Sequence, residues 1–127
     1  MLGGWSYAEM GRSGPRGLID RNGILTLTVT GRKSGREIPR PVQSVLQDDS
    51  IFLIPFMGKS TNWYVSLMSN PRVKITKGKV KFTAEAKILD EKGAKEAVEL
   101  FINAYGKRMM ESRYPSKDAA ARILMPE

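Results

Sequence analysis

Residues 25–42 read LTLTVTGRKSGREIPRPV, and this stretch sets the fold that we expect. Apolar side chains at 25, 27 and 29 alternate with three threonines, which predicts a half-buried β-strand over residues 25–30. Pro39 and Pro41 lie further on, where they exclude a helix and favour extended backbone. The stretch therefore predicts two extended segments joined by a glycine-rich turn.

That turn combines two glycines, one hydroxyl and three cations, in the order Gly31, Arg32, Lys33, Ser34, Gly35 and Arg36. The glycines let neighbouring N–H groups point into one concavity, and the serine and the cations add further donors. Such a turn is suited to holding phosphate or carboxylate. It is neither a Walker A loop nor a GxGxxG loop, because the glycine spacing differs and no helix follows. An ordinary basic hairpin turn contains the same residue types, so that interpretation stays open.

The chain has 127 residues, enough for one domain with a single core. We expect that domain to span residues 1–127. Its first part, residues 1–23, should be irregular, with Trp5, Tyr7 and Met10 packed on the core or over a ligand. The formal net charge of +8 predicts an anionic partner: nucleic acid, an acidic membrane surface or a polyanionic small molecule. Solubility alone is the other explanation for that charge.

Two residue types are absent, which excludes several kinds of site. Without cysteine there is no disulfide, thiol nucleophile or thiolate metal site, and without histidine there is no imidazole base or histidine-bound metal. We therefore expect no metal, and catalysis must use carboxylates, tyrosine, lysine, serine or a bound cofactor. The longest apolar run, residues 51–57, is too short to span a bilayer, and the N-terminus has no apolar secretory core. These features indicate a cytoplasmic protein.

A second pair of strands is expected over residues 40–46 and 51–55, joined by a tight turn at Asp48 and Asp49. The later strand is apolar on both faces, so we place it in the centre of the sheet. The loop at residues 56–60, FMGKS, again offers a glycine, a cation and a hydroxyl. It therefore repeats the chemistry of the first turn.

Helices are expected over residues 63–69 and 91–105. Between them, the strands 73–76 and 80–88 are expected to form another antiparallel hairpin. Asp90 caps the longer helix and Gly106 ends it. The two hairpin strands alternate apolar with mainly basic side chains, as in an antiparallel sheet that is wet on one face. Residues 116–125 fit either a helix or a final edge strand.

Taken in order, several motifs resemble the deazaflavin-dependent nitroreductase family. They are TGRKSGRE at residues 30–37 followed by P-x-P-V, an apolar hairpin, GKSTNWY at residues 58–64 and SNPRV at residues 69–73. The resemblance implies an α+β protein, a mostly antiparallel split β-barrel of about six strands with two or three helices. Such barrels are related to the pyridoxamine-phosphate-oxidase-like proteins that bind FMN.

The resemblance also implies an oxidoreductase that binds coenzyme F420, a deazaflavin with a phosphate and an oligoglutamate tail. Its reduced form would pass hydride to a quinone- or nitroaromatic-like acceptor. Carried over by position, the first turn would meet the phosphate and the glutamyl carboxylates through Arg32, Lys33, Ser34, Gly35 and Arg36. The deazaflavin and its ribityl side would lie against Pro41, Val42, Pro55, Met57, Gly58, Lys59 and Trp63.

Hydride chemistry belongs to the cofactor, which suits a chain without histidine or cysteine. No catalytic residue is assigned, and Tyr64 and Tyr105 are the candidates for giving a proton to the reduced acceptor. One alternative is an FMN-binding split-barrel reductase or cofactor carrier. Another is a nucleic-acid-binding barrel that uses the lysines of residues 79–87, although that face has no aromatic side chains for base stacking. Split barrels often pair, so a homodimer is expected.

Overall fold

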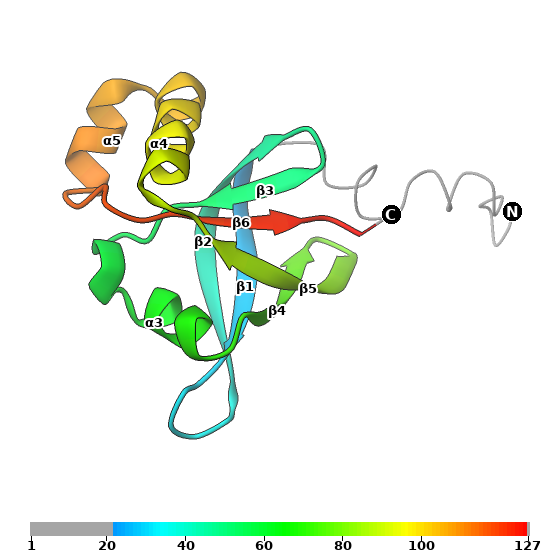
Figure 1. Ribbon diagram of the computed structural model, residues 1–127. Coiled ribbons are helices and arrows are strands. Elements are labelled where there is room, and N and C mark those ends of the chain that lie inside the picture. The colour runs from blue at the N-terminus through cyan, green and yellow to red at the C-terminus, as the bar shows by residue number, and fades with distance from the viewer. Residues whose placement is uncertain (1–21, 127) are drawn as a thin grey trace, which may run out of the picture.

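A computed structural model describes residues 22–126 of the chain. Its six strands close into a barrel in the order β1-β2-β3-β6-β5-β4, and every neighbouring pair is antiparallel (Figure 1). The strands are β1 (Gly23–Thr30), β2 (Glu37–Gln47), β3 (Ser50–Leu53), β4 (Arg72–Lys77), β5 (Val80–Ile88) and β6 (Ala121–Leu124). This architecture confirms the α+β split β-barrel that the resemblance implied.

The N-terminal segment is described only at its end. Residues 1–21, with Trp5, Tyr7 and Met10, lie outside the described residues, so the packing expected of that trio stays a prediction. Gly23 already begins β1, two residues before the alternation that predicted this strand.

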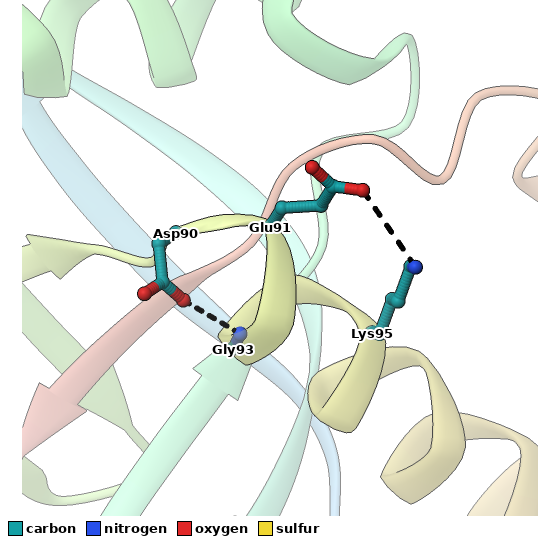
Figure 2. A network of polar contacts seen from close by, with 4 residues as sticks. All are labelled: Asp90, Glu91, Gly93 and Lys95. Atoms are coloured by element: carbon teal, nitrogen blue, oxygen red, sulfur yellow. Dashed lines mark hydrogen bonds and ion pairs between the residues drawn. The ribbon is translucent and has the colours of Figure 1, made fainter.

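Within the described residues, three helices lie outside the barrel: α3 (Asn62–Ser69), α4 (Glu91–Tyr105) and α5 (Lys107–Arg113), with a 3-10 turn η1 (Gly58–Ser60) before the first. α4 begins as predicted, because the Asp90 carboxylate accepts a hydrogen bond from the Gly93 N–H at 2.8 Å (Figure 2). Glu91 then pairs with Lys95 one turn later, at 3.6 Å (Figure 2). Gly106 ends α4 at φ 94°, and α5 follows it, which the sequence pattern did not predict.

Two apolar clusters hold these layers together. One fills the barrel with inward-facing strand residues, among them the fully buried Leu27, Ile75 and Ile123. The other lies between the barrel and the two C-terminal helices and includes Phe101 and Met110. The apolar stripe predicted for α4 therefore packs on the outside of the barrel, against β2.

The C-terminal segment forms a strand and not a helix. Of the two alternatives that the sequence left open, the strand is confirmed, but β6 pairs with β3 on one side and β5 on the other, so it closes the barrel and does not lie at an edge. Ala121 and Ile123 are buried while Arg122 and Leu124 are exposed. Four residues are too few for their periodicity to distinguish a strand from a helix. The segment forms a strand because β3 and β5 each have a free edge that it pairs with.

β2 changes its partner partway along its length. Residues 37–44 pair with β1, and residues 45–47 pair with β3 instead. Pro39 and Pro41 lie in the first part, which has a neighbouring strand on one side only, so their missing N–H groups interrupt no second ladder. The space beside this part of β2 is left to loops and helices.

Candidate cofactor-binding site

A pocket of about 250 Å³ opens where β2 and β3 part. Residues of β1 and β2 form one wall, the chain that follows β3 forms another, and α3 and the end of α5 complete it. The lining residues are Ile24, Pro41, Val42, Gln43, Ile54, Phe56, Trp63, Arg113 and Tyr114. Pro41, Val42 and Trp63, which the resemblance assigned to the cofactor, are thus brought together.

This pocket is mainly apolar. Ile24 is 64% exposed and Phe56 is 52% exposed, so two large apolar side chains that line it are in contact with solvent. Trp63, by contrast, is buried and adds an aromatic wall. Aromatic and aliphatic walls suit a planar ring system, because a flat ligand removes such surfaces from water.

Tyr114 and Arg113 come from a segment to which the sequence assigned no role. Only Met109 and Met110 are apolar among the seven residues of α5, so no periodicity marks this helix or places Tyr114 near Trp63. The sequence does contain aromatic residues at positions 56 and 114, but no local pattern indicates that they lie close together. In the structure their rings lie 6.2 Å apart.

Tyr114 is 6% exposed, and its ring also packs edge-to-face on Phe101, with the two ring centroids 5.9 Å apart. Burial raises the pKa of its phenol, the nearby Tyr105 adds to that rise, and the charge of Arg113 opposes it. The phenol is therefore protonated at neutral pH. The hydrogen bonds among residues 22–126 do not include one from its hydroxyl, and its side chain lines the pocket.

The basic turn forms the tip of the β1–β2 hairpin, which projects from the barrel (Figure 1). Its three cations are exposed and form no ion pair with any described residue. Several main-chain donors are used inside the turn: Gly31 donates to the Arg36 carbonyl at 2.8 Å, Gly35 to the Gly31 carbonyl at 2.9 Å, and Arg36 to the Ser34 hydroxyl at 3.1 Å. An anion here would therefore meet the cationic side chains more than a nest of N–H groups.

The second glycine–cation loop is covered by another segment. Gly58 is buried, and a Cβ at that position would clash with the carboxylate of Asp118. Met57 donates its N–H to Thr61 Oγ1 at 2.7 Å, and the Ser60 hydroxyl donates to the Met57 carbonyl at 2.8 Å. These groups hold the loop itself and are not available to a ligand.

Lys59 and Tyr64 line a different hollow, between α3, the start of α4 and residues 117–118. Tyr64 follows Trp63 directly in α3, yet the two side chains line different hollows, with ring centroids 6.3 Å apart in an edge-to-face arrangement. The residues that the resemblance assigned to the cofactor are thus divided among the pocket, the hairpin tip and this second hollow.

The two basic loops still leave the barrel at the same end. β1 and β3 are both antiparallel to β2, so they run in the same direction and the loops after them emerge together. β3 stops at Leu53, level with Ser44, whereas the hairpin continues to Glu37, roughly 23 Å further along β2. Lys33 therefore lies at the far tip of the hairpin, and the 56–60 loop starts near its base.

Tyr105 is tied to the barrel. Its hydroxyl donates to the Ser44 carbonyl at 2.5 Å, at the point where β2 changes partner. Burial raises the pKa of the Tyr105 phenol, and hydrogen bonds with the Gln43 side chain and the Gly23 backbone act against that rise. Because its proton already serves the main chain and it does not line the pocket, its geometry favours holding α4 on β2 over proton transfer.

The amino-acid sequence matches one known family over most of its length. A family model described as F420H(2)-dependent quinone reductase matches residues 7–115. No curated protein matches the chain significantly. Among the helices of residues 22–126, none has the length and apolar character needed to cross a membrane.

Solved structures match most of the described fold. An F420-H2 dependent reductase, FDR-A, is 21% identical, with 79% of this chain and 92% of that chain covered and a TM-score of 0.64. A domain-swapped dimer is 19% identical, with 92% of each chain covered and a TM-score of 0.64. A FAD-binding protein from Mesorhizobium loti is 17% identical, with 97% and 91% covered and a TM-score of 0.61. At these identities the likeness concerns the fold, and it agrees with the split barrel.

Proposed function

Because the chain belongs to the F420H2-dependent quinone reductase family, and is thus an F420-dependent oxidoreductase, we propose that it reduces a quinone- or nitroaromatic-like acceptor in the pocket where β2 leaves β3. One observation carries this proposal: an open pocket with aromatic walls lies at the base of a hairpin whose tip holds cations that pair with no residue of 22–126. The aromatic pocket suits a planar acceptor and a deazaflavin ring. The cations of the hairpin tip suit the anionic tail of the coenzyme.

The described residues fit the two chemically different parts of F420. We assign the ring to the wall made by Pro41, Val42 and Trp63, where an apolar surface excludes water from a planar group. Pro55 and Met57 precede and follow Phe56 in the chain, but neither of them nor Gly58 is among the residues that line the pocket. We assign the phosphate and glutamyl carboxylates to the hairpin tip, where Arg32, Lys33 and Arg36 pair with no described residue and Ser34 adds a hydroxyl, in a turn that Gly35 permits at φ 71°.

When bound in its reduced form, the coenzyme supplies a hydride. The reduced acceptor also needs a proton at oxygen, and we assign this proton to the Tyr114 phenol, which lines the pocket and is protonated at neutral pH. Arg113 lies next to it and would stabilise negative charge on the acceptor oxygen. Ile24 and Phe56 would be covered by the ligands and keep water from the reacting groups.

The test is turnover of F420H2 with menadione, followed by the recovery of F420 fluorescence. Tyr114→Phe should lower kcat by about a hundredfold, because a positioned proton donor contributes at least about that much. Tyr105→Phe is the matched control and should change kcat by less than about threefold, since Tyr105 does not line the pocket and its hydroxyl donates to the Ser44 carbonyl. Equal losses in the two variants, or no loss in Tyr114→Phe, would contradict the assignment.

The cofactor class is tested separately by binding. Purified protein is titrated with F420 and with FMN at the same low ionic strength, and the fluorescence of each cofactor reports binding. F420 should bind more tightly, because its tail carries more negative charge for the hairpin tip to meet. Tighter binding of FMN would favour the alternative of an FMN-dependent split-barrel reductase.

A further inference from the structure

Gln43 lines the pocket where β2 and β3 part, but the proposed reduction gives it no role. It follows Val42 on β2, and its partner across the β1–β2 ladder is Ile24, which lines the same pocket. The residue is half-buried, so its carboxamide lies where the protein meets the space that a ligand would fill. A polar group at such a place can fix the orientation of a ligand in a mainly apolar pocket.

The carboxamide differs in chemistry from the other polar side chains of the pocket. The Arg113 guanidinium and the Trp63 indole can only donate hydrogen bonds, and the Tyr114 phenol carries the proton that we assign to the acceptor. The Gln43 carbonyl oxygen, in contrast, can only accept. Among the described side chains that line the pocket, Gln43 is therefore the one with an obligatory acceptor.

Tyr105 determines which part of this carboxamide is already engaged. The Tyr105 hydroxyl has one proton, and it donates that proton to the Ser44 carbonyl at 2.5 Å. The phenol also hydrogen-bonds with the Gln43 side chain, so its oxygen accepts from an amide N–H of Gln43. The other hydrogen bonds among residues 22–126 do not include the Gln43 side chain. Its carbonyl oxygen and its second N–H thus remain for a ligand.

A carbonyl oxygen beside an N–H is complementary to a cyclic imide. The pyrimidine ring of a deazaflavin contains such an imide, in which an N–H lies between two carbonyls. A carboxamide can pair with this edge through two hydrogen bonds, because it accepts from the imide N–H and donates to one imide carbonyl. A quinone or a nitroaromatic has acceptor oxygens and no such N–H, so it matches the donors Arg113 and Tyr114 instead.

We propose that Gln43 is a specificity-determining residue that recognises the imide edge of the deazaflavin ring. This inference rests on the proposed function, because it needs the ring in this pocket. It adds the group by which the pocket distinguishes the coenzyme ring from the acceptor. Gln43 transfers no proton, so its contribution is to the affinity for the ring.

Two ligands that differ only at the imide test this pairing. Deazariboflavin carries the ring and the ribityl chain without phosphate or glutamates, so the hairpin tip does not contribute. Its imide N-methyl derivative lacks the proton that Gln43 would accept. Each ligand is titrated into the full chain without an acceptor, and the ligand fluorescence gives the Kd. Methylation should raise the Kd by about tenfold, because the hydrogen bond is lost and the Gln43 carbonyl is left without a donor.

Variants at the two glutamines of the chain test the residue. Gln43→Met keeps the length of the side chain and removes both hydrogen-bonding groups. It should raise the Kd of deazariboflavin by about tenfold and bring the two ligands within about twofold of each other. Gln47→Met is the matched control, since Gln47 lies on the same strand and does not line the pocket. It should keep the factor between the ligands, and so should Tyr105→Phe, because the Gln43 carboxamide is unchanged.

The outcomes separate this inference from the proposed function. The inference alone is overturned if the two ligands bind the parent chain equally, if the factor between them survives in Gln43→Met, or if Gln47→Met abolishes it. Binding of F420 without measurable binding of deazariboflavin would show that the tail alone holds the coenzyme, which also overturns the inference. If F420 does not bind either, the proposed function fails with it.

Discussion

The two glycine–cation loops, residues 31–36 and 56–60, have similar sequences and different surroundings. Gly35 stands at φ 71° in open space, where a Cβ would have no atom within 4 Å. Gly58 stands at φ 61°, but Ser116 and Asp118 lie over it. Both glycines serve a left-handed backbone, and only Gly58 also permits the close approach of another segment.

This difference shows how a turn motif relates to a binding site. The residue types of a glycine–cation loop establish that the chain can bend and that a charge is near. Whether a ligand reaches the bend depends on what covers it. At the hairpin tip nothing within the described residues pairs with the cations, whereas the other loop uses its donors to hold itself against the C-terminal segment.

The largest effect is expected from alanine at each glycine. Gly58→Ala should lower the free energy of unfolding by about 2–4 kcal/mol, because backbone strain and overpacking against Ser116 and Asp118 add. Gly35→Ala should cost about 1 kcal/mol, from strain alone. Urea unfolding of both variants measures the contrast. Equal losses would mean that residues 116–118 move away readily and that the two loops do not differ as described.

The next effect concerns coenzyme affinity. Replacing Arg32, Lys33 and Arg36 together by glutamine should weaken F420 binding by about tenfold at low salt and by less at high salt, because exposed ion pairs are screened. Lys59→Gln should change the affinity by less than about twofold, since Lys59 lines the other hollow. Fluorescence titration at two ionic strengths gives both values. A loss in Lys59→Gln that matches the triple variant would show that the two loops hold the coenzyme together.

Smaller effects should follow from the hydroxyl groups of the two loops. Thr61→Ala removes the acceptor of the Met57 N–H and should cost about 1–1.5 kcal/mol of stability. Ser34→Ala removes an acceptor at the exposed tip and should cost about 0.5 kcal/mol. Thermal unfolding ranks the two variants. The reverse order would indicate that the tip is held more rigidly than the covered loop.

The smallest effect is expected on the free energy of unfolding at alkaline pH, through Tyr64 beside the covered loop. Burial raises the pKa of the Tyr64 phenol above 10.0, and the negative charge of Asp118 adds to the rise. A raised pKa means that the folded state holds this proton more tightly than the unfolded state, so its contribution is complete below pH 10 and falls as pH rises through the folded value. Between about pH 8 and about pH 10.5, the free energy of unfolding should therefore fall more for the parent chain than for Tyr64→Phe. Identical pH slopes would argue against this linkage.

Long regular patterns made much of the barrel predictable. β5 alternates over nine residues and α4 has a capping aspartate and a terminating glycine, so local rules were enough for both. β6 and α5 escaped prediction because one is four residues long and the other has two apolar residues among seven. The residues that line the pocket divide in the same way: the family resemblance assigned Pro41, Val42 and Trp63 to the cofactor, whereas the positions of Tyr114 and Arg113 depend on where α5 lies.

By itself, the sequence determined the strands of β1 to β5, the glycine turn between β1 and β2, the start and end of α4, and the family. These depend on alternation, capping and turn geometry, which act between residues close in the chain. Only the tertiary structure decided that β6 closes the barrel, that Tyr114 lines the pocket beside Trp63, and that one basic loop is open while the other is covered. Those outcomes arise from contacts between distant segments, such as the bridge from Met57 to Ser116, which no local pattern encodes.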